Sequence, residues 1–265
     1  MNKTMLLPVL MRPAPTPATP ATRVVATVPP LYEPALVRQL FNYMALTYRW
    51  HAILVAGLTG WWRRQLVARL PLAPGQRVVD LMTGTGELWS RLLPRLGPTG
   101  RVRAVDFSSS MLHAAARRRT ALPAGQQVSL HHADACCSGL ASGSADVVVS
   151  AFGLKTLAPA AYPALAAEIV RLLVPGGTVA LLELTVPASG WRRLVCLHYM
   201  QALNCLLQQI GGPLTIHAHL LSYARRFATL DEVAAACRAA GLINVRVEQL
   251  TGGIASVLLA EQPAR

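Results

Sequence analysis

The sequence has little acidic charge. Only 12 of its 265 residues are aspartate or glutamate, against 25 lysines and arginines, so its formal net charge is +13. Nearly all of these cations are arginines, because the only lysines are Lys3 and Lys155. A basic surface suits nucleic acid, anionic lipid or an anionic substrate, although a compositional bias toward arginine explains it equally well. Because no basic run is interleaved with aromatic residues, we expect no nucleic acid among the partners.

Cysteine is scarce, and long apolar runs are missing. The five cysteines have spacings that fit no metal motif, and a chain of this length needs no disulfide bonds, so reduced thiols are expected. His217-Ala218-His219 offers two imidazoles without a third ligand, and we predict no metal site. No run approaches the roughly 18 apolar residues that span a bilayer. We therefore expect a cytoplasmic protein, with peripheral contact at the inner membrane left open by its apolar, arginine-rich composition.

Composition divides the chain into a tail and one domain. Residues 1–30 contain seven prolines and no acidic residue, which indicates a flexible tail or, alternatively, an acid-poor targeting leader. Residues 31–265 are expected to form a single domain. Within it, apolar residues at helical spacing in residues 31–70 predict N-terminal helices. The alternative roles of these helices are packing in the core, covering an apolar substrate and contacting a membrane. The aromatic residues of these helices are Phe41, Tyr43, Tyr48, Trp50, Trp61 and Trp62.

From Arg77 onward, short apolar runs alternate with helical patterns, which predicts an α/β fold with a doubly wound, mainly parallel seven-stranded sheet. The predicted strands are 77–81, 101–107, 127–131, 145–151, 178–184, 244–250 and 254–261. The predicted helices among them are 87–96, 109–119, 162–173, 191–209 and 230–240. The last two strands are joined only by Thr251-Gly252-Gly253, so we expect them to form an antiparallel hairpin.

A glycine-rich turn, Asp80-Leu81-Met82-Thr83-Gly84-Thr85-Gly86, follows the first predicted strand. Its two glycines let the backbone approach a ligand, and the helix beyond offers unpaired N–H groups. Asp106 ends the second predicted strand, 20 residues past Gly86, where a carboxylate can accept both hydroxyls of a ribose. Asp134 follows the third strand and can reach an adenine amino group. The alternative is that each aspartate caps its own loop.

The same turn helps to choose the cofactor. NAD and S-adenosylmethionine (SAM) both contain a ribose, but a dinucleotide site normally has the pattern G-x-G-x-x-G. The third glycine is absent here. SAM has no phosphate and carries a sulfonium cation and an amino-acid tail, which Asp80 and the turn amides suit better. We therefore predict SAM as the cofactor, and a dehydrogenase is the weaker alternative.

Four blocks of the sequence form a recognisable pattern. The blocks are Val79 to Glu87, Ala151-Phe152-Gly153-Leu154-Lys155-Thr156, Arg171 to Glu183 with its Pro175-Gly176-Gly177, and Leu250-Thr251-Gly252-Gly253-Ile254-Ala255. With these blocks the chain resembles class I SAM-dependent methyltransferases, and specifically the ubiquinone/menaquinone biosynthesis C-methyltransferase family. The first and third blocks are common to many methyltransferases, whereas the second and fourth are particular to the quinone branch. The resemblance extends from about Phe41 to Glu261.

The resemblance implies a Rossmann-like methyltransferase fold and a set of cofactor contacts. Gly84 and Thr85 would contact the methionine part of SAM, Asp106 would hold the ribose, and Asp134-Ala135 would flank the adenine. Ala151 stands where the family usually has serine, so its contact would come from the backbone. Together with Asp80 and Gly86, these residues form the expected cofactor site.

The substrate side departs from the family pattern. The family's Tyr-Asp pair is Tyr48-Arg49 here, and its Arg-Asn pair is Lys155-Thr156. Lys155 follows a strand end, where a cation could lower the pKa of a ring hydroxyl, unless it is an ordinary surface lysine. The segment 185–229 corresponds to the part from which the family builds its substrate pocket. Its residues His198 and Tyr223, together with Lys155, are the predicted catalytic residues.

The resemblance implies SAM-dependent C-methylation of a prenylated benzoquinol or naphthoquinol in ubiquinone or menaquinone biosynthesis. A lipophilic aromatic substrate of this kind would be the main partner. Methyl transfer to another aromatic small molecule and a catalytically silent quinone- or SAM-binding partner are the alternatives. No feature of the sequence indicates an oligomeric state.

Overall fold

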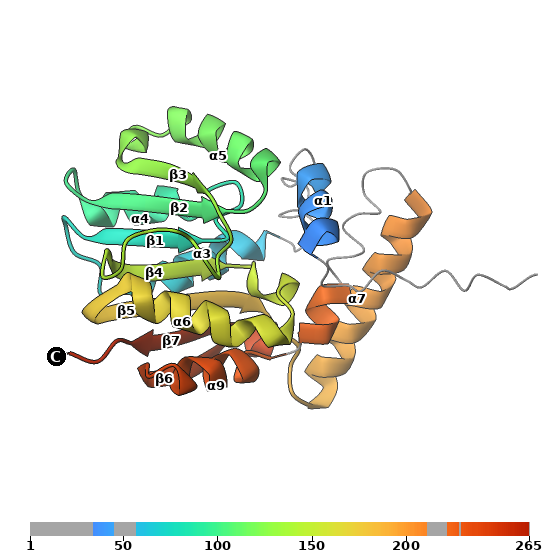
Figure 1. Cartoon of the computed structure of the whole chain (residues 1–265). Helices are drawn as coiled ribbons and strands as arrows, with labels where there is room; N and C mark the ends of the chain where they lie inside the picture. The colour runs from blue at the N-terminus through green and yellow to red at the C-terminus, as the bar shows by residue number, and fades with distance from the viewer. Residues whose placement is uncertain (1–33, 45–56, 211–221, 228, 265) are drawn as a thin grey trace, which may run out of the picture.

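The computed structural model describes residues 34–44, 57–210, 222–227 and 229–264. They contain a seven-stranded sheet with the order β3-β2-β1-β4-β5-β7-β6 (Figure 1). Its strands are β1 (Arg77–Leu81), β2 (Arg101–Asp106), β3 (Val128–His132), β4 (Ala145–Ala151), β5 (Leu173–Leu184), β6 (Ile243–Leu250) and β7 (Ala255–Glu261). The first five strands are parallel, and β7 is antiparallel to both β5 and β6. The predicted fold class, including the terminal hairpin, is confirmed.

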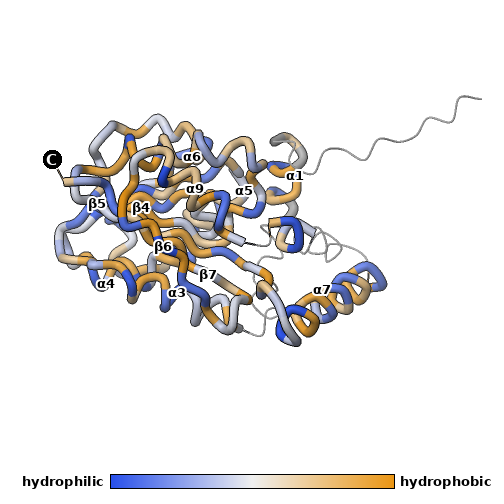
Figure 2. The backbone as a smooth tube through the Cα atoms, turned by 90° about the horizontal axis from the view of Figure 1, so that it is seen from below, coloured by the Kyte–Doolittle hydropathy of each residue, from blue (hydrophilic) through white to orange (hydrophobic). Residues whose placement is uncertain are grey.

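Helices cover both faces of the sheet. The helices are α1 (Pro34–Met44), α3 (Leu58–Ala68), α4 (Trp89–Leu96), α5 (Ser109–Ala121), α6 (Tyr162–Leu172), α7 (Gly190–Ile210) and α9 (Asp231–Ala239), and residues 222–227 are also helical. Side chains of α3 and α4 pack in one hydrophobic cluster with the sheet, and those of α6 and α9 pack in another. The central strands between them are strongly hydrophobic (Figure 2). A doubly wound sheet follows from these two buried layers.

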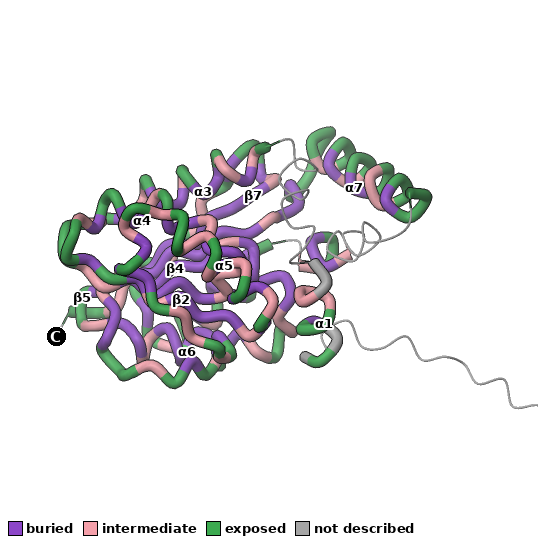
Figure 3. The backbone as a smooth tube through the Cα atoms, turned by 90° about the horizontal axis from the view of Figure 1, so that it is seen from above, coloured by how far each residue is buried: buried purple, intermediate pink, exposed green. Residues whose placement is uncertain are grey.

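The sheet order reverses between β1 and β4. The chain passes outward from β1 to β2 and β3, and then returns to the other side of β1 to form β4 and β5. In open α/β sheets, ligands bind beyond the carboxyl ends of the strands at such a reversal. Both α1 and α7 lie beyond these carboxyl ends, at the same end of the molecule (Figures 1 and 3).

Two predicted elements start in the wrong place by two residues or more. β5 begins at Leu173 rather than at residue 178, because Pro175-Gly176-Gly177 is part of the strand and not a separate turn. The pairing with β4 absorbs this segment through a register shift between Ala145 and Val147. The helix predicted from residue 87 starts at Trp89, since residues 84–88 still form turns.

Several sequence-based expectations fall partly or wholly outside the described residues. These are the tail 1–30, the His217-Ala218-His219 pair and the Tyr48-Arg49 departure. The predicted N-terminal helices correspond to α1 and α3, and the segment 185–229 contributes α7 and the helix 222–227. In these described parts of the chain, no helix combines the length and apolar character needed to cross a bilayer.

Candidate functional site

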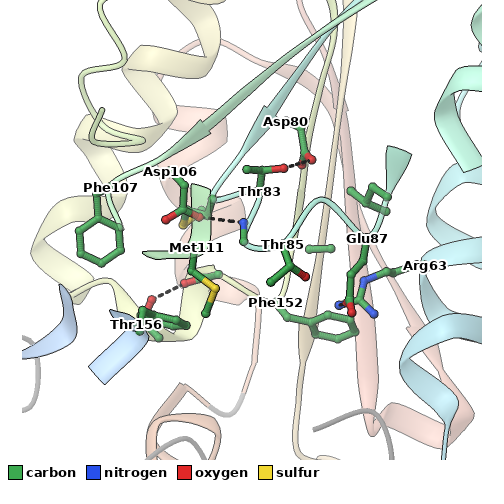
Figure 4. A pocket seen from close by; sticks show the side chains of 16 residues that line it. Arg63, Asp80, Thr83, Thr85, Glu87, Asp106, Phe107, Met111, Phe152 and Thr156 are labelled. Carbon is green, nitrogen blue, oxygen red and sulfur yellow. Dashed lines mark hydrogen bonds and ion pairs between the residues drawn. The ribbon is translucent and has the colours of Figure 1, made fainter. Parts of the chain in front are cut away.

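A pocket opens at the carboxyl ends of β1, β2 and β4, where the sheet order reverses (Figure 4). It encloses about 550 Å³ of empty space, its open mouth included. Of the predicted cofactor residues, Asp80, Gly84, Thr85, Asp106 and Ala151 line this pocket. The other lining residues are Phe41, Arg63, Met82, Thr83, Glu87, Leu88, Phe107, Met111, Phe152, Gly153 and Thr156.

Asp80 ties the turn to the helix that follows it. Its Oδ2 accepts hydrogen bonds from the Thr83 hydroxyl at 2.5 Å and from the Trp89 indole Nε1 at 3.0 Å. Burial raises the pKa of the Asp80 carboxyl to about 7, although these two hydrogen bonds act in the opposite direction. A buried carboxylate next to the turn provides a place for positive charge, and it titrates near neutral pH.

The two glycines of the turn are needed for different reasons. Gly84 has φ +57°, and an added Cβ would meet no atom within 4 Å, so the turn is open above it. Gly86 has φ +77°, but its Cβ would lie 2.5 Å from the Trp89 ring. Gly84 therefore leaves space where a ligand can approach the backbone, whereas Gly86 allows Trp89 to pack beneath the turn.

Asp106 joins the second strand to the turn. Its Oδ2 accepts from the backbone N–H of Gly84 at 2.8 Å, and its Oδ1 accepts from that of Ser108 at 2.9 Å. Burial raises the pKa of Asp106, while these backbone N–H groups oppose the change. A carboxylate has about four acceptor sites, so two remain available on a side chain that lines the pocket. This arrangement fits a ligand with two neighbouring hydroxyls.

Apolar side chains complete this part of the pocket. Phe107 follows Asp106 directly, Met111 lies on the first turn of α5, and Met82 belongs to the turn after β1. The Phe41 ring of α1 packs edge-on against Phe107, with 6.2 Å between the ring centroids. Flat aromatic and thioether surfaces suit a planar heterocycle such as adenine. None of these residues is among the predicted cofactor contacts, although Phe107 and Met111 flank the start of a helix beside the predicted ribose ligand.

Asp134 and Ala135 do not line the pocket among the described residues. Asp134 is exposed, and its Oδ1 accepts from the backbone N–H of Cys136 at 2.8 Å, so it caps its own loop. Ala135 is buried in the hydrophobic cluster beside α6. Gly86 supports the turn from behind without lining the pocket. Contacts of Asp134 and Ala135 with adenine stay a prediction.

An ion pair closes one side of the pocket. Arg63 of α3 pairs with Glu87, and its guanidinium lies 5.0 Å from the centroid of the Phe152 ring. Arg118 of α5 donates to the carbonyl oxygen of Thr85 at 2.8 Å and reaches Glu87 at 3.9 Å. Positive charge from two helices thus meets beside the turn. The sequence does not predict that Arg63 and Arg118 both lie near Glu87, because this arrangement depends on how α3 and α5 pack.

Lys155 is a buried ion-pair partner rather than a surface lysine. It is 2% exposed, its Nζ lies 3.0 Å from Glu183 Oε1, and it also donates to the carbonyl oxygen of Phe152. Phe152 has φ +67°, an unusual conformation for a residue other than glycine. Lys155 and Glu183 therefore hold the end of β4 in the form that presents Phe152 and Thr156 to the pocket.

The three predicted catalytic residues, Lys155, His198 and Tyr223, are not among the described residues that line the pocket. His198 is exposed on α7, with its Nδ1 2.7 Å from the carbonyl oxygen of Leu194, and Tyr223 is buried in the helix 222–227. Their catalytic roles stay predictions. Over the described residues, no three histidine, cysteine or acidic side chains are arranged to hold a metal ion.

Comparisons with known proteins agree with this geometry. Residues 31–261 match the model of the ubiE/COQ5 methyltransferase family. A demethylmenaquinone methyltransferase of Thermus thermophilus is 34% identical over 77% of this chain and 90% of its own length. One from Anoxybacillus flavithermus is 29% identical over 76% of this chain and 84% of its own length.

Solved structures share the fold. A SAM-dependent methyltransferase from Aquifex aeolicus is 18% identical, with a TM-score of 0.55, over 75% of this chain and 88% of that one. Phosphoethanolamine N-methyltransferase 2 of Haemonchus contortus, in complex with SAM, is 17% identical with a TM-score of 0.54, over 73% of this chain and 50% of that one. The family match covers the whole pocket described above, and so the chain belongs to the ubiE/COQ5 methyltransferase family and is a SAM-dependent methyltransferase.

Proposed function

We propose that this enzyme methylates a ring carbon of a prenylated quinol, with a naphthoquinol of the demethylmenaquinone type as the favoured substrate and a benzoquinol as the related one. The observation that carries this choice is the name shared by its relatives, which are demethylmenaquinone methyltransferases at 26–34% identity. The pocket adds support, because Ala151, Phe152 and Thr156 from the quinone-type block at the end of β4 line it.

The cofactor side follows from the residues that line the pocket. Bound SAM supplies an electrophilic methyl group. We assign the ribose hydroxyls to Asp106, whose two remaining acceptor sites face the pocket, and the amino-acid tail to the open backbone at Gly84 and Thr85. Phe107 and Met111 supply an apolar surface for the adenine. Asp134 and Ala135 are proposed to contact the adenine as well, although neither lines the pocket within the described part of the chain.

Methylation of a ring carbon requires the quinol to lose a proton from a ring hydroxyl. A ring carbon is a weak nucleophile, and loss of the proton from a neighbouring hydroxyl raises its electron density. His198 and Tyr223, both in the segment 185–229, are the proposed proton-handling residues. Lys155 is proposed to act through Phe152, since its Nζ lies 5.8 Å from the centroid of that ring and forms an ion pair with Glu183. pH–rate profiles of His198→Ala, Tyr223→Phe and Lys155→Met distinguish these roles, because loss of a proton-handling residue changes the shape of the profile.

Transfer assays with defined acceptors test the substrate. The enzyme is mixed with SAM and a demethylated naphthoquinol, a demethylated benzoquinol or an unrelated catechol, after calorimetry has established SAM binding and the lack of NAD binding. We expect the fastest transfer to the naphthoquinol. Transfer to the catechol alone would favour another aromatic substrate, and SAM binding without transfer to any acceptor would favour a catalytically silent partner.

A further inference from the structure

Helix α7 has a buried apolar face and, beside it, a row of exposed apolar residues. Its inner face contributes Cys196 and Met200 to a small cluster with Val186 and Ala224. Its outer face carries six large apolar or aromatic side chains, each between 51% and 69% exposed. These six are Trp191, Leu194, Val195, Tyr199, Leu206 and Ile210. At 3.6 residues per turn, Trp191, Val195, Tyr199, Leu206 and Ile210 fall in one stripe along the helix, beside the buried Met200 and Leu207, and Leu194 lies next to this stripe. These six side chains are here called the outer α7 surface, and Figure 3 shows that exposed positions run along this helix.

This concentration of exposed apolar side chains is particular to α7. Elsewhere among the described residues, only Trp61 and Ile243 are large apolar side chains of comparable exposure. Isolated apolar residues on a protein surface are normal, whereas a contiguous apolar surface marks an interaction site. Figure 2 shows hydrophobic and hydrophilic positions side by side along α7, as in a helix that lies at a boundary between two media.

The charge around this surface has one sign. No acidic residue occurs in the sequence between Glu183 and Asp231, whereas four arginines do: Arg192, Arg193, Arg225 and Arg226. The Arg192 guanidinium lies 5.6 Å from the centroid of the Trp191 ring. Arg225 donates to Gln201 Oε1 at 2.7 Å, and so it lies beside α7. The apolar surface is therefore bordered by positive charge that no nearby carboxylate of this segment neutralises.

We propose that the outer α7 surface docks on an anionic lipid bilayer, with its apolar side chains in the interfacial region and the arginines near the lipid phosphates. An apolar helix face bordered by arginine is the pattern that binds anionic interfaces. A second copy of the chain fits less well, because a two-fold contact would bring the same arginines together in a protein of net charge +13. The proposal deepens the proposed function and rests on it for the reason to dock, since a prenylated substrate resides in the bilayer. It also places the bilayer at the end of the molecule where the pocket opens (Figure 1).

Vesicle co-sedimentation tests the docking without any substrate. The full-length protein is mixed with vesicles of phosphatidylcholine alone or of phosphatidylcholine with phosphatidylglycerol. We expect binding to the mixed vesicles that weakens as salt is added, because the arginine contribution is screened. In the variant Val195→Glu/Leu206→Glu, the partition coefficient should fall by about tenfold or more, since two exposed apolar side chains that would enter the lipid interface become negative charges.

The matched control is Ile243→Glu, which places the same charge at a side chain that is 44% exposed on β6, away from α7. It should bind the mixed vesicles as the unaltered protein does. An equal loss in Ile243→Glu, or no binding by the unaltered protein, would overturn the proposal.

Two further outcomes would also overturn it. A dimer that Val195→Glu/Leu206→Glu converts to a monomer, without vesicle binding, would make this surface a contact between copies. A melting temperature that falls by several degrees in the double variant, again without vesicle binding, would show that the chain itself covers the surface. Methyl transfer to a short-chain, water-soluble quinol reads the proposed function separately, and we expect it to be the same in all three proteins.

Discussion

The carboxyl ends of the central strands and helix α7 lie at the same end of the molecule but are built in opposite ways. At the strand ends, Asp80, Asp106 and Glu183 are buried, and each accepts hydrogen bonds from the protein. On α7, large apolar side chains face outward. The strand ends are thus held in place by hydrogen bonds within the protein, whereas the side chains of the outer α7 surface make few contacts within the protein. Substitutions should therefore have large effects on stability and cofactor binding at the strand ends and small effects on stability at the outer α7 surface.

The largest effect is expected at the buried ion pair. Lys155→Met leaves Glu183 without its charged partner and should lower the free energy of unfolding by about 3–5 kcal/mol. Denaturant unfolding followed by circular dichroism measures this. Lys155→Met/Glu183→Gln should be less destabilised than the sum of the two single variants. Simple additivity would show that the pair is not coupled, and the strand ends would then resemble α7 more closely.

Cofactor affinity should depend on Asp106 more than on Asp134. Asp106→Ala removes the acceptor of two backbone N–H groups and the proposed ribose ligand, so SAM binding should weaken by about 2 kcal/mol or more, close to thirtyfold. Calorimetry measures the dissociation constant. Asp134→Ala, at an exposed loop-capping residue, is the control and should have a smaller effect. Equal losses would mean that both aspartates hold the cofactor directly.

Asp80 should make the stability of the ligand-free protein depend on pH. Burial raises its pKa from 3.8 to about 7, so between these values the folded protein holds a proton that the unfolded chain releases. Its contribution to stability is therefore largest at low pH and is lost as the pH rises toward about 7, by at most ~1.4 kcal/mol per pH unit. Asp80→Asn should remove this contribution in unfolding curves recorded from pH 5 to about pH 8. An unchanged pH dependence in Asp80→Asn would assign it to another group.

The smallest effect is expected on the outer face of α7, where adjacent leucines give a direct comparison. Leu206 is 52% exposed, whereas Leu207 is 1% exposed. Leu206→Ala should change the free energy of unfolding by no more than about 0.5 kcal/mol. Leu207→Ala should cost about 2–5 kcal/mol, because it removes a buried side chain. Similar losses in the two variants would mean that the outer face of α7 is packed against something in the isolated protein.

The same contrast explains what the sequence could predict. The positions of Gly84 and Asp106 at the pocket could be predicted, because a turn and the strand end beside it form a local pattern whose residue types follow from the backbone geometry. The central parallel strands β1, β4 and β5 were predicted because buried parallel strands are continuous apolar runs. The start of β5 was missed because a register shift against β4 accommodates Pro175 within a strand.

Other features depend on contacts between distant residues. The ion pair of Lys155 with Glu183 requires β4 and β5 to be neighbours, and no residue near Lys155 in the sequence reveals its burial. Arg63 reaches Glu87 only because α3 packs beside α4. The exposure of Leu206 could not be predicted either, because apolar residues extend around much of α7, and only the packing shows which of them are covered.

The central claim is methylation of a quinol ring carbon, and a product analysis tests it most directly. The enzyme is incubated with isotopically labelled SAM and a short-chain demethylnaphthoquinol, and the position of the labelled methyl group is determined by nuclear magnetic resonance. Our account predicts a single product with the label bonded to the ring carbon next to a hydroxyl. A label bonded to oxygen, or no labelled product from enzyme that binds SAM in calorimetry, would contradict it.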